Sequence, residues 1–466
     1  LEDIKDETER KEQGCVRIRS VRQGCCVLLI SGYMLYYYNV VLGISSVFIG
    51  GMMMAARIFD ALNDPFMGII VAKTKTRWGR FRPWIFTGTV LNAVVIYALF
   101  SAPSSATANA MKVWCSVFYV LWGVTYTMMD IPFWSMIPAI TEPGKDREGL
   151  TSLARASAGV GDAVPTVLTM VIVPVLGGGA SLMNYRIGFR WWAILIAAVF
   201  VISEVVFCVC VPEPAQEEDM KSEGLGDMFR ALFRNDQAVT IVVSIIFVYT
   251  ALNIVGNLIL YFFQFDVGNT DAYSVFTAVC FLAQVLLMAS VPLLRKRADK
   301  IRLFMAGFVL QLAGFLVILL MSAARAYDGG RWWILCVPGI LVYGGYGIQN
   351  VLLTVFLADS VDYGEMMNGT REDSVIFSMQ TFTVKLASGL AVFIAGIVIR
   401  VINLDRNAAV QSAGTLGGLR MSMTVMPAIL LVAGMLIFRK YFRLTQARME
   451  EITAKLAERR ASENAQ

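Results

Sequence analysis

Repeated apolar runs of transmembrane length restrict the folds open to this sequence. Hydropathy places these runs near residues 23–42, 45–71, 84–102, 111–140, 151–177, 190–212, 238–264, 271–294, 301–323, 332–359, 374–401 and 420–439. A run of about 20 apolar residues crosses a bilayer as a helix, because lipid offers an open backbone no hydrogen-bond partner. With 57% hydrophobic and 16% charged residues, the chain is expected to be an all-α membrane protein of about twelve transmembrane helices.

Charged loops divide these runs into two halves. Basic residues gather in two corresponding connections, which carry Lys73, Lys75, Arg77, Arg80 and Arg82 in the first half and Arg295, Lys296, Arg297, Lys300 and Arg302 in the second. Because cytoplasmic loops are enriched in Lys and Arg, we expect both connections and both termini on the cytoplasmic side of the cell membrane. The expected parts are an N-terminal segment 1–22, a six-helix bundle 23–212, a linker 213–237, a second six-helix bundle 238–440 and a tail 441–466.

The composition excludes several classes of function. The sequence contains no histidine, which removes imidazole metal sites and histidine proton relays. The eight cysteines show no zinc-site spacing and are expected to be buried thiols. The net charge of +5 lies in short loops, which indicates membrane topology rather than nucleic-acid binding. We find no nucleophile–base pair and no metal motif, and we expect neither a resident cofactor, nor enzymatic activity, nor a cleavable signal peptide.

Carboxylates within the second apolar run are the strongest indication of function. Asp60 and Asp64 are four residues apart, so on an α-helix they lie one turn apart on nearly the same face. Ionised groups at membrane depth cost about 2.5–3.5 kcal/mol each and usually contact an ion or substrate. Carboxylates, amides and hydroxyls supply the oxygen ligands that hard cations prefer. The expected cation site consists of Asp60, Asn63, Asp64, Thr127 and Asp130. The alternative is that Arg57 simply pairs with Asp60.

The fourth and fifth apolar runs carry groups suited to a sugar. Asp130 precedes Pro132, which is expected to free a backbone carbonyl nearby. Trp134 lies one turn beyond Asp130, where its ring offers an apolar platform to a sugar whose hydroxyls donate to the carboxylate. The alternative for Trp134 is a place in the interfacial aromatic belt. Arg155, among small residues of the fifth run, is expected to bind substrate oxygens or to pair with Asp130.

Polar residues in the second half are candidates for further substrate contacts. Lys385 is the only basic residue of the stretch MQTFTVKLASGLAVF and lies far from both ends of its apolar run, so snorkelling is not expected. The candidate amides of this half are Asn253, Asn257, Gln349, Asn350 and Gln380. Such amides either line a cavity or hydrogen-bond between helices, and the sequence favours neither role.

A charged cluster follows the tenth apolar run. Its carboxylates are expected to face the basic connections and the segment around Lys145. Ion pairs there would close the cytoplasmic side of a transporter and break when it opens. The expected gate residues are Arg147, Asp359, Asp362, Glu365 and Arg371. The alternative is a solvated acidic helix end, where ion pairs contribute little.

Several of these segments together resemble one family of transporters. The segments are ARIFDALNDPFMG, TRWGRFRPW, YTMMDIPFW, ADSVDYGE and SMQTFTVKLASG. In order and spacing they are similar to the glycoside–pentoside–hexuronide:cation symporters of the melibiose permease type, within the major facilitator superfamily. The similarity runs from about residue 30 to the end of the last apolar run.

The resemblance implies two sets of ligands. It places a cation at Asp60, Asn63, Asp64 and Thr127. It places sugar contacts at Tyr126, Asp130, Trp134, Arg155, Gln380 and Lys385. The family resemblance also implies that the cation, Na⁺ with H⁺ or Li⁺ as alternatives, shares a cavity with the sugar and raises its affinity. Linkage makes such coupling reciprocal.

Three positions depart from the family pattern. Melibiose-type members carry a lysine and an aspartate near the start of the first span, where this chain has Gln23 and Gly24. Asn350 stands where family members offer a tryptophan. Hexuronides, pentosides and other glycosides are therefore at least as strong candidates as galactosides.

We expect a monomeric secondary transporter that couples influx of a monovalent cation to uptake of a glycoside, pentoside or hexuronide by alternating access. Its expected partners are a small sugar or glycoside, the cation and the lipid bilayer, without nucleic acid. A cation-coupled lysolipid carrier is the first alternative, since a eukaryotic branch of the superfamily moves lipids with similar cation motifs. A non-transporting membrane sugar sensor is the second.

Overall fold

The computed structural model of the chain describes residues 26–103, 107–140, 161, 164–179, 181–211, 233–368, 373–408 and 410–464. These residues form helices and their connections, with no β-strand among them. Their contacts divide the chain into two compact units, Leu1–Ser222 and Glu223–Gln466. The all-α class expected from the apolar runs is confirmed.

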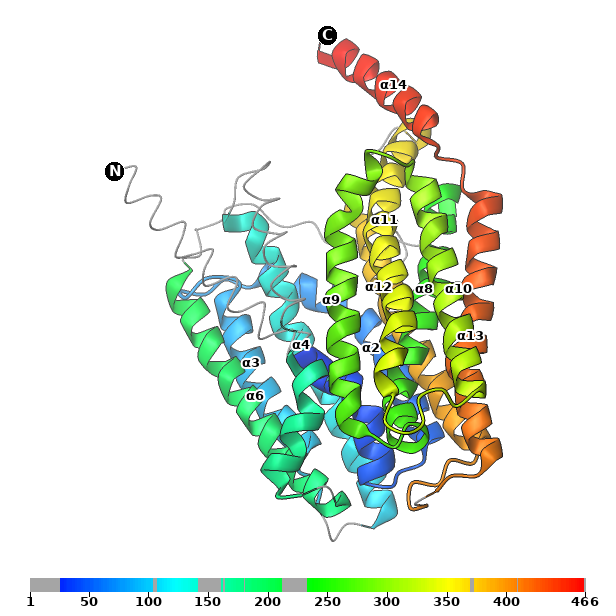
Figure 1. Ribbon diagram of the computed structural model, residues 1–466. Coiled ribbons are helices and arrows are strands. Elements are labelled where there is room, and N and C mark those ends of the chain that lie inside the picture. Colours follow the sequence, from blue (N-terminus) through cyan, green and yellow to red (C-terminus); the bar gives the residue numbers. More distant parts are fainter. Residues whose placement is uncertain are drawn as a thin grey trace, which may run out of the picture. The chain divides into compact units, whose positions relative to one another are not determined.

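The first unit contains long helices that follow the apolar runs. They are 26–36, which continues into the π-helix η1 (Tyr37–Val41), then α2 (Ser46–Lys73), α3 (Arg82–Leu99), α4 (Ala108–Ile140), 164–177 and α6 (Leu182–Cys210). Pro83 stands in the first turn of α3, where its missing N–H costs no helical hydrogen bond. Helix α3 packs against both α4 and α6, and α2 packs against α4 (Figure 1). Helix α4 is therefore held between two neighbours.

The second unit contains the remaining elements. They are α8 (Asp236–Tyr261), the π-helix η2 (Phe262–Asp266), α9 (Thr270–Arg295), α10 (Lys300–Ala323), η3 (Trp332–Leu335), α11 (Cys336–Asn368), α12 (Asp373–Val401), α13 (Ala413–Tyr441) and α14 (Gln446–Asn464). Asn235, Asn269 and Ser412 cap α8, α9 and α13 by accepting a hydrogen bond from a backbone N–H three residues further on. Helix α8 packs against α11, α12 and α13, and α11 packs in addition against α9 and α10.

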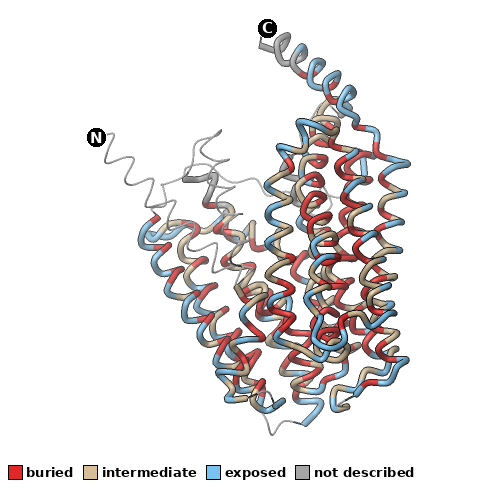
Figure 2. The backbone as a smooth tube through the Cα atoms, in the orientation of Figure 1, coloured by how far each residue is buried: buried red, intermediate tan, exposed pale blue. Residues whose placement is uncertain are grey.

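Most of the described helices are built to cross a membrane. Eight are long and apolar enough to do so, and two shorter apolar helices, Cys26–Val41 and Val164–Gly177, accompany them. Helices α2 and α4 are as long, with 28 and 33 residues. Figure 2 shows buried positions along the inward faces of the helices and exposed positions along the outward faces of each unit. The outward face of α6 carries Leu195, Ile202 and Val209, whose seven-residue spacing forms an apolar stripe suited to lipid.

Helix 26–36 and helix α8 end in the same way, each within its own unit. Each continues into a five-residue π-helix, and after one further residue comes a glycine, Gly43 or Gly268, with φ of 77° or 71°. Glycine adopts this conformation without the strain that a side chain would bring. Two main-chain hydrogen bonds recur in both turns: the N–H of the residue before the glycine donates five residues back, and the N–H of the residue after the glycine donates six residues back. The segments LYYYNVVLG and LYFFQFDVG therefore form an internal repeat of both sequence and structure.

Asp266, the last residue of η2, joins three elements of the second unit. Arg420 of α13 donates to its two carboxylate oxygens from Nε at 2.9 Å and from Nη2 at 2.6 Å. The hydroxyl of Tyr327, in the connection between α10 and η3, donates to Oδ2 at 2.5 Å. The Asp266 side chain is only 1% exposed. A buried carboxylate with a bidentate guanidinium and a phenol is well compensated, so this cluster fixes one end of the unit.

Candidate functional site

The acidic cluster of the first unit is formed by α2 and α4. Asp60 is buried, with 4% of the residue exposed, and Asp64 is partly buried one turn further along α2. The hydroxyl of Thr127, on α4, donates to Asp64 Oδ1 at 3.1 Å. Asn63 is partly buried between the two aspartates in sequence. Of the predicted cation ligands, Asp64 of α2 and Thr127 of α4 are therefore in direct contact.

Gly123 of α4 makes room for the Asp60 carboxylate. A Cβ atom added at this position would lie 2.1 Å from Asp60 Oδ1 and 2.8 Å from its Cγ. Both distances are far below van der Waals contact, so no side chain fits without displacing the carboxylate. The absence of a side chain at this glycine lets Asp60 approach α4 closely.

A buried amide fixes the position of α4 against α3. Asn92 of α3 donates from Nδ2 to Thr125 Oγ1 at 2.8 Å and to the Trp122 carbonyl at 3.2 Å. Asn92 is fully buried, so its hydrogen bonds are strong determinants of helix register. On the other side of α4, the guanidinium carbon of Arg57 lies 5.4 Å from the Trp122 ring centroid. The segment of α4 that carries Gly123 and Thr127 is therefore held from both sides.

The predicted sugar residues of α4 form a hydrogen-bonded pair. Trp134 Nε1 donates to Asp130 Oδ1 at 3.0 Å. Both side chains are partly buried, and Tyr126 is partly buried one turn earlier. The bond orients the indole beside a carboxylate, which suits a ligand with both an apolar face and hydroxyl groups. A purely interfacial role for Trp134 does not require this partner.

Oxygen donors, rather than a dense cluster of acids, characterise the site. Among the described residues, no three His, Cys, Asp or Glu side chains lie close enough together to hold a metal ion. The Thr127 hydroxyl contacts Asp64, and Asn63 precedes Asp64 in the sequence. Neutral oxygen donors with few carboxylates suit a monovalent cation better than a divalent one, because the net charge to be balanced is smaller.

The predicted substrate residues of the second unit lie on α12. Gln380 and Lys385 are both partly buried. Gln380 Nε2 donates to Thr354 Oγ1 of α11 at 3.5 Å. Arg155, the remaining predicted sugar ligand, lies outside the described residues.

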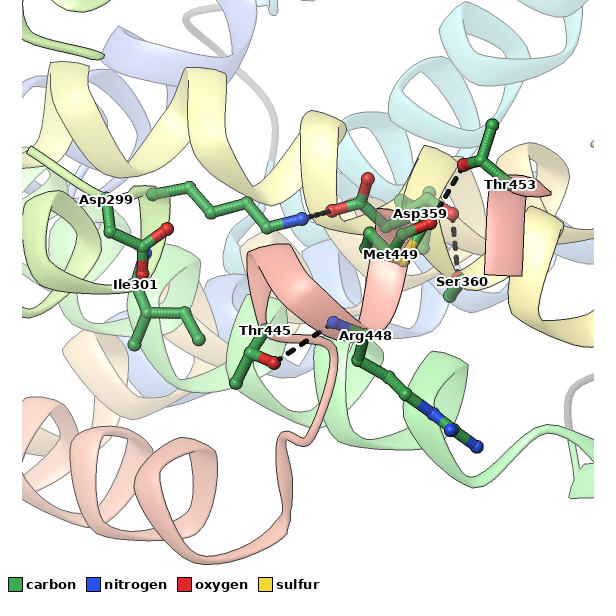
Figure 3. Close-up of polar contacts among 10 residues, drawn as sticks. Asp299, Ile301, Asp359, Ser360, Thr445, Arg448, Met449 and Thr453 are labelled. Atoms are coloured by element: carbon green, nitrogen blue, oxygen red, sulfur yellow. Dashed lines mark hydrogen bonds and ion pairs between the residues drawn. The ribbon is translucent and has the colours of Figure 1, made fainter. Parts of the chain in front are cut away.

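The predicted gate residues are only partly described. Lys300, at the start of α10, donates to the carboxylate of Asp359 on α11, and their side chains are 4% and 17% exposed. Figure 3 shows Asp359 beside α14, near Met449 and Thr453. Because both side chains are largely buried, Asp359 is not part of a solvated acidic helix end, the alternative considered above. Asp362 and Glu365 are partly buried on the same helix, whereas Arg147 and Arg371 lie outside the described residues.

The amides of the second unit separate into two groups. Gln311 Nε2 donates to Gln349 Oε1 at 2.5 Å, and both residues are fully buried between α10 and α11. Asn253 and Asn257 donate at 2.7 Å to carbonyls of their own helix. The glutamine pair therefore links α10 and α11 in the interior of the unit, whereas Asn253 and Asn257 bond within α8.

Sequence reasoning missed Gly123 and Asn92. Gly123 precedes Thr127 by four residues and Asp130 by seven, so it shares their face of α4. That spacing was a usable signal. Asn92 lies within an apolar run as a single amide, and nothing in the sequence indicates that α4 is its partner.

Comparisons with known proteins agree with this arrangement. The sequence matches the family described as MFS/sugar transport protein over residues 20–446. The isoprimeverose transporter of Lactiplantibacillus pentosus is 29% identical over 441 residues, covering 94% of this chain and 89% of that protein. The inner membrane symporter YicJ of Escherichia coli (strain K12) is 25% identical over 430 residues, covering 91% of this chain and 90% of that protein.

A solved structure supports the fold. A D-xylose–proton symporter aligns with a TM-score of 0.65 at 12% identity, covering 94% of this chain and 98% of that one. At this identity the likeness concerns the fold alone. The expected major facilitator architecture is confirmed. The matching family consists of transporters and not of enzymes, as expected. Because the family match spans most of the sequence and the described helices have the fold of such transporters, this multi-pass membrane protein belongs to the MFS/sugar transport family.

Proposed function

We propose that this chain couples the influx of a monovalent cation, with Na⁺ as the first candidate, to the uptake of a glycoside, pentoside or hexuronide by alternating access. Family membership supports sugar transport, and the similarity to a symporter supports coupling to an ion. The similarity to an isoprimeverose transporter favours a pentoside as the first substrate to test. H⁺ and Li⁺ are the alternative cations.

The observation that carries the proposal is the contact between Asp64 and Thr127, with Asp60 against Gly123 one turn away. A cation bound here would lie beside two carboxylates that share one helix face, and their negative charges favour its binding. It also draws the oxygens of α2 and α4 together.

Helix α4 provides the physical link between cation and sugar. Asp130 and Trp134 follow Thr127 by three and seven residues, so all three share one face of the helix. A cation that fixes Thr127 therefore also fixes the pair that offers a carboxylate and an indole to the sugar. Since binding of each ligand pre-organises α4 for the other, the two affinities rise together. Tyr126, Arg155, Gln380 and Lys385 are proposed as further sugar ligands.

The remaining assignments concern topology and gating. We place both termini in the cytoplasm of the cell on the basis of loop charge. The parts are proposed to be 1–22, 23–212, 213–237, 238–440 and 441–466. The residues proposed to control the cytoplasmic side are Arg147, Asp359, Asp362, Glu365 and Arg371. The transporter is proposed to act as a monomer.

Uptake into proteoliposomes tests the function. Purified protein is offered radiolabelled isoprimeverose, lactose, xylosides and glucuronides, with inward gradients of Na⁺, Li⁺ or H⁺ imposed one at a time. Accumulation that follows one gradient identifies both substrate and cation. Binding without counterflow would instead indicate a sensor. Stabilisation by lysophosphatidylcholine but by no sugar would indicate a lipid carrier.

A further inference from the structure

The outward face of α10 carries one continuous apolar stripe that begins with a cation. Its exposed positions recur every three or four residues, which places them on one face of the helix. They are Arg302, Ala306, Val309, Ala313, Leu316 and Leu320. From Arg302 to Leu320 the stripe is about 27 Å long at 1.5 Å per residue, close to the roughly 30 Å of a bilayer's hydrocarbon core. Arg302 therefore lies at the level where lipid chains give way to headgroups.

The outward face of α13 has the same pattern, with its cations at the end of the helix instead of the start. Ile429 and Leu436 are 64% and 57% exposed, and Arg439 and Lys440 follow them. The Lys440 ammonium lies 5.1 Å from the centroid of the Tyr441 ring, and Tyr441 is half exposed. Because tyrosine is enriched at membrane interfaces, this end of α13 also lies at the level of the headgroups.

Packing brings the two charged ends together within the second unit. Helices α10 and α13 lie side by side (Figure 1). The rings of Phe304 and Phe438 contact each other with centroids 4.5 Å apart, and a Cβ atom added at Gly434 would lie 3.9 Å from the ring of Phe308. These contacts show that the helices are antiparallel. The charged end of each stripe lies just beyond the first contact, so the two charged ends are neighbours.

The cations at these ends have no structural partner. Helices α10 and α13 each contain another basic residue, Lys300 and Arg420, that is largely buried and paired with an aspartate. Arg302, Arg439 and Lys440 are exposed instead. Their side chains form no ion pair or hydrogen bond with any residue that the structure describes. Three positive charges at the edge of the membrane are therefore available to an anionic ligand.

An anionic phospholipid fits both parts of this surface. Its acyl chains match the two stripes, whose exposed positions beyond the cations are all apolar. One leaflet contributes about 15 Å of hydrocarbon, a length that reaches about Ala313 on α10 and Ile429 on α13. Its phosphate oxygens accept the hydrogen bonds that guanidinium and ammonium groups donate. A soluble anion would use the cations but leave the stripes without a role.

We propose that Arg302, Arg439 and Lys440 bind the phosphate of one anionic diacyl phospholipid, whose chains lie along the boundary between α10 and α13. Basic residues that flank transmembrane helices attract anionic headgroups, and each contributes about fivefold in affinity. Three such residues on two neighbouring helices therefore retain one lipid more tightly than the bulk bilayer. The bound lipid stabilises the packing of α10 against α13, whichever sugar or cation the protein carries.

Native mass spectrometry of the purified full-length protein in mild detergent tests the site. Phosphatidylglycerol and phosphatidylcholine with identical chains are added in turn, without sugar. Wild type is expected to bind one phosphatidylglycerol about 100-fold more tightly than phosphatidylcholine, as for three cations of about fivefold each. The double variant Arg439→Gln/Lys440→Gln is expected to lose about 25-fold in affinity for phosphatidylglycerol and less than about twofold for phosphatidylcholine.

Two further variants make the result specific. Arg302→Gln tests the contribution of α10 and is expected to lose about fivefold in affinity for phosphatidylglycerol. The double variant Arg448→Gln/Lys455→Gln is the matched control, because it also removes two exposed positive charges, from α14. Its affinity for phosphatidylglycerol is expected to stay within about twofold of wild type. Melting curves check that every variant folds, and all of the exchanged side chains are exposed.

The outcomes separate a built lipid site from general attraction of charge. Equal binding of the two lipids by wild type, or equal losses in Arg439→Gln/Lys440→Gln and in the α14 control, overturns the site. Displacement of the lipid by soluble glycerol 3-phosphate at the same concentration overturns the role of the chains. A dimer that forms in wild type and dissociates in Arg439→Gln/Lys440→Gln assigns the face to a second copy of the chain instead.

Discussion

Replacing Gly123 with alanine offers a sharp test of the close contact between α2 and α4. The new Cβ would lie 2.1 Å from Asp60 Oδ1, where ordinary contact needs about 3.4 Å. The cheapest relief is rotation of the carboxylate away from α4, which removes one ligand from the proposed cation site. Overpacking of this kind costs about 1–3 kcal/mol, and that energy corresponds to about 5- to 150-fold in cation affinity.

The assay is the cation concentration that half-saturates thermal stabilisation of the purified protein. For Gly123→Ala this concentration is expected to rise at least about fivefold. Gly68→Ala is the matched control, because Gly68 lies on α2 and its added Cβ would meet no atom within 4 Å. An unchanged half-saturating concentration in Gly123→Ala, with its melting temperature intact, would refute the role assigned to this contact.

Three further perturbations follow from described contacts. Thr127→Val keeps the side-chain shape but removes the bond to Asp64, so cation affinity is expected to fall about fivefold, the value of one hydrogen bond of about 1 kcal/mol; titration of cation-dependent uptake measures it. Arg420→Met leaves Asp266 buried without its bidentate partner, which should destabilise the protein by about 3–5 kcal/mol and lower the melting temperature without a change in substrate preference. Burial, and then the bond to Asp266, raises the pKa of Tyr327 above its usual 10.0. The unfolded chain therefore loses this proton first, so the stability from Tyr327 is complete below pH 10 and declines as pH rises further; melting curves between about pH 8 and 11 should show a smaller alkaline loss in Tyr327→Phe than in wild type.

The helices of this protein were predictable because a bilayer permits few alternatives. The second apolar run was expected over residues 45–71 and α2 spans Ser46–Lys73; the fourth was expected over 111–140 and α4 spans Ala108–Ile140. Lipid compels the backbone to satisfy its own hydrogen bonds, so hydropathy and length define these elements well. Side-chain partners follow no such rule.

The residues of the candidate site were predictable only where their side chains have functional groups that bind ligands. Asp64 and Thr127 were chosen for their oxygens, and the structure joins them by a hydrogen bond. Gly123 has no functional group, and its importance arises from the distance between two helices, which the sequence does not contain. The hydrogen bonds of Asn350 likewise involve Tyr249, which is distant in the sequence, and Tyr346, which lies on the same helix. Only the folded unit brings their hydroxyls together.

The π-helical turns were missed although their sequences repeat. LYYYNVVLG and LYFFQFDVG share aromatic residues and a closing glycine, which gave a usable signal. Their meaning was hidden because a π-turn differs from an α-turn only in its main-chain hydrogen bonds. Only the second repeat contains an aspartate, Asp266, and the first has Val41 at the same place. The ion pair of Asp266 with Arg420 therefore distinguishes the two repeats.

Gradient-driven accumulation in proteoliposomes tests the central claim most directly. Wild type and Asp60→Asn are compared in two assays on the same vesicles: sugar exchange at equal cation concentration, and sugar accumulation against an inward cation gradient. The account predicts that wild type performs both, and that Asp60→Asn retains exchange but loses accumulation. Accumulation by Asp60→Asn at the wild-type level would contradict the claim that the cation acts through the carboxylates of α2.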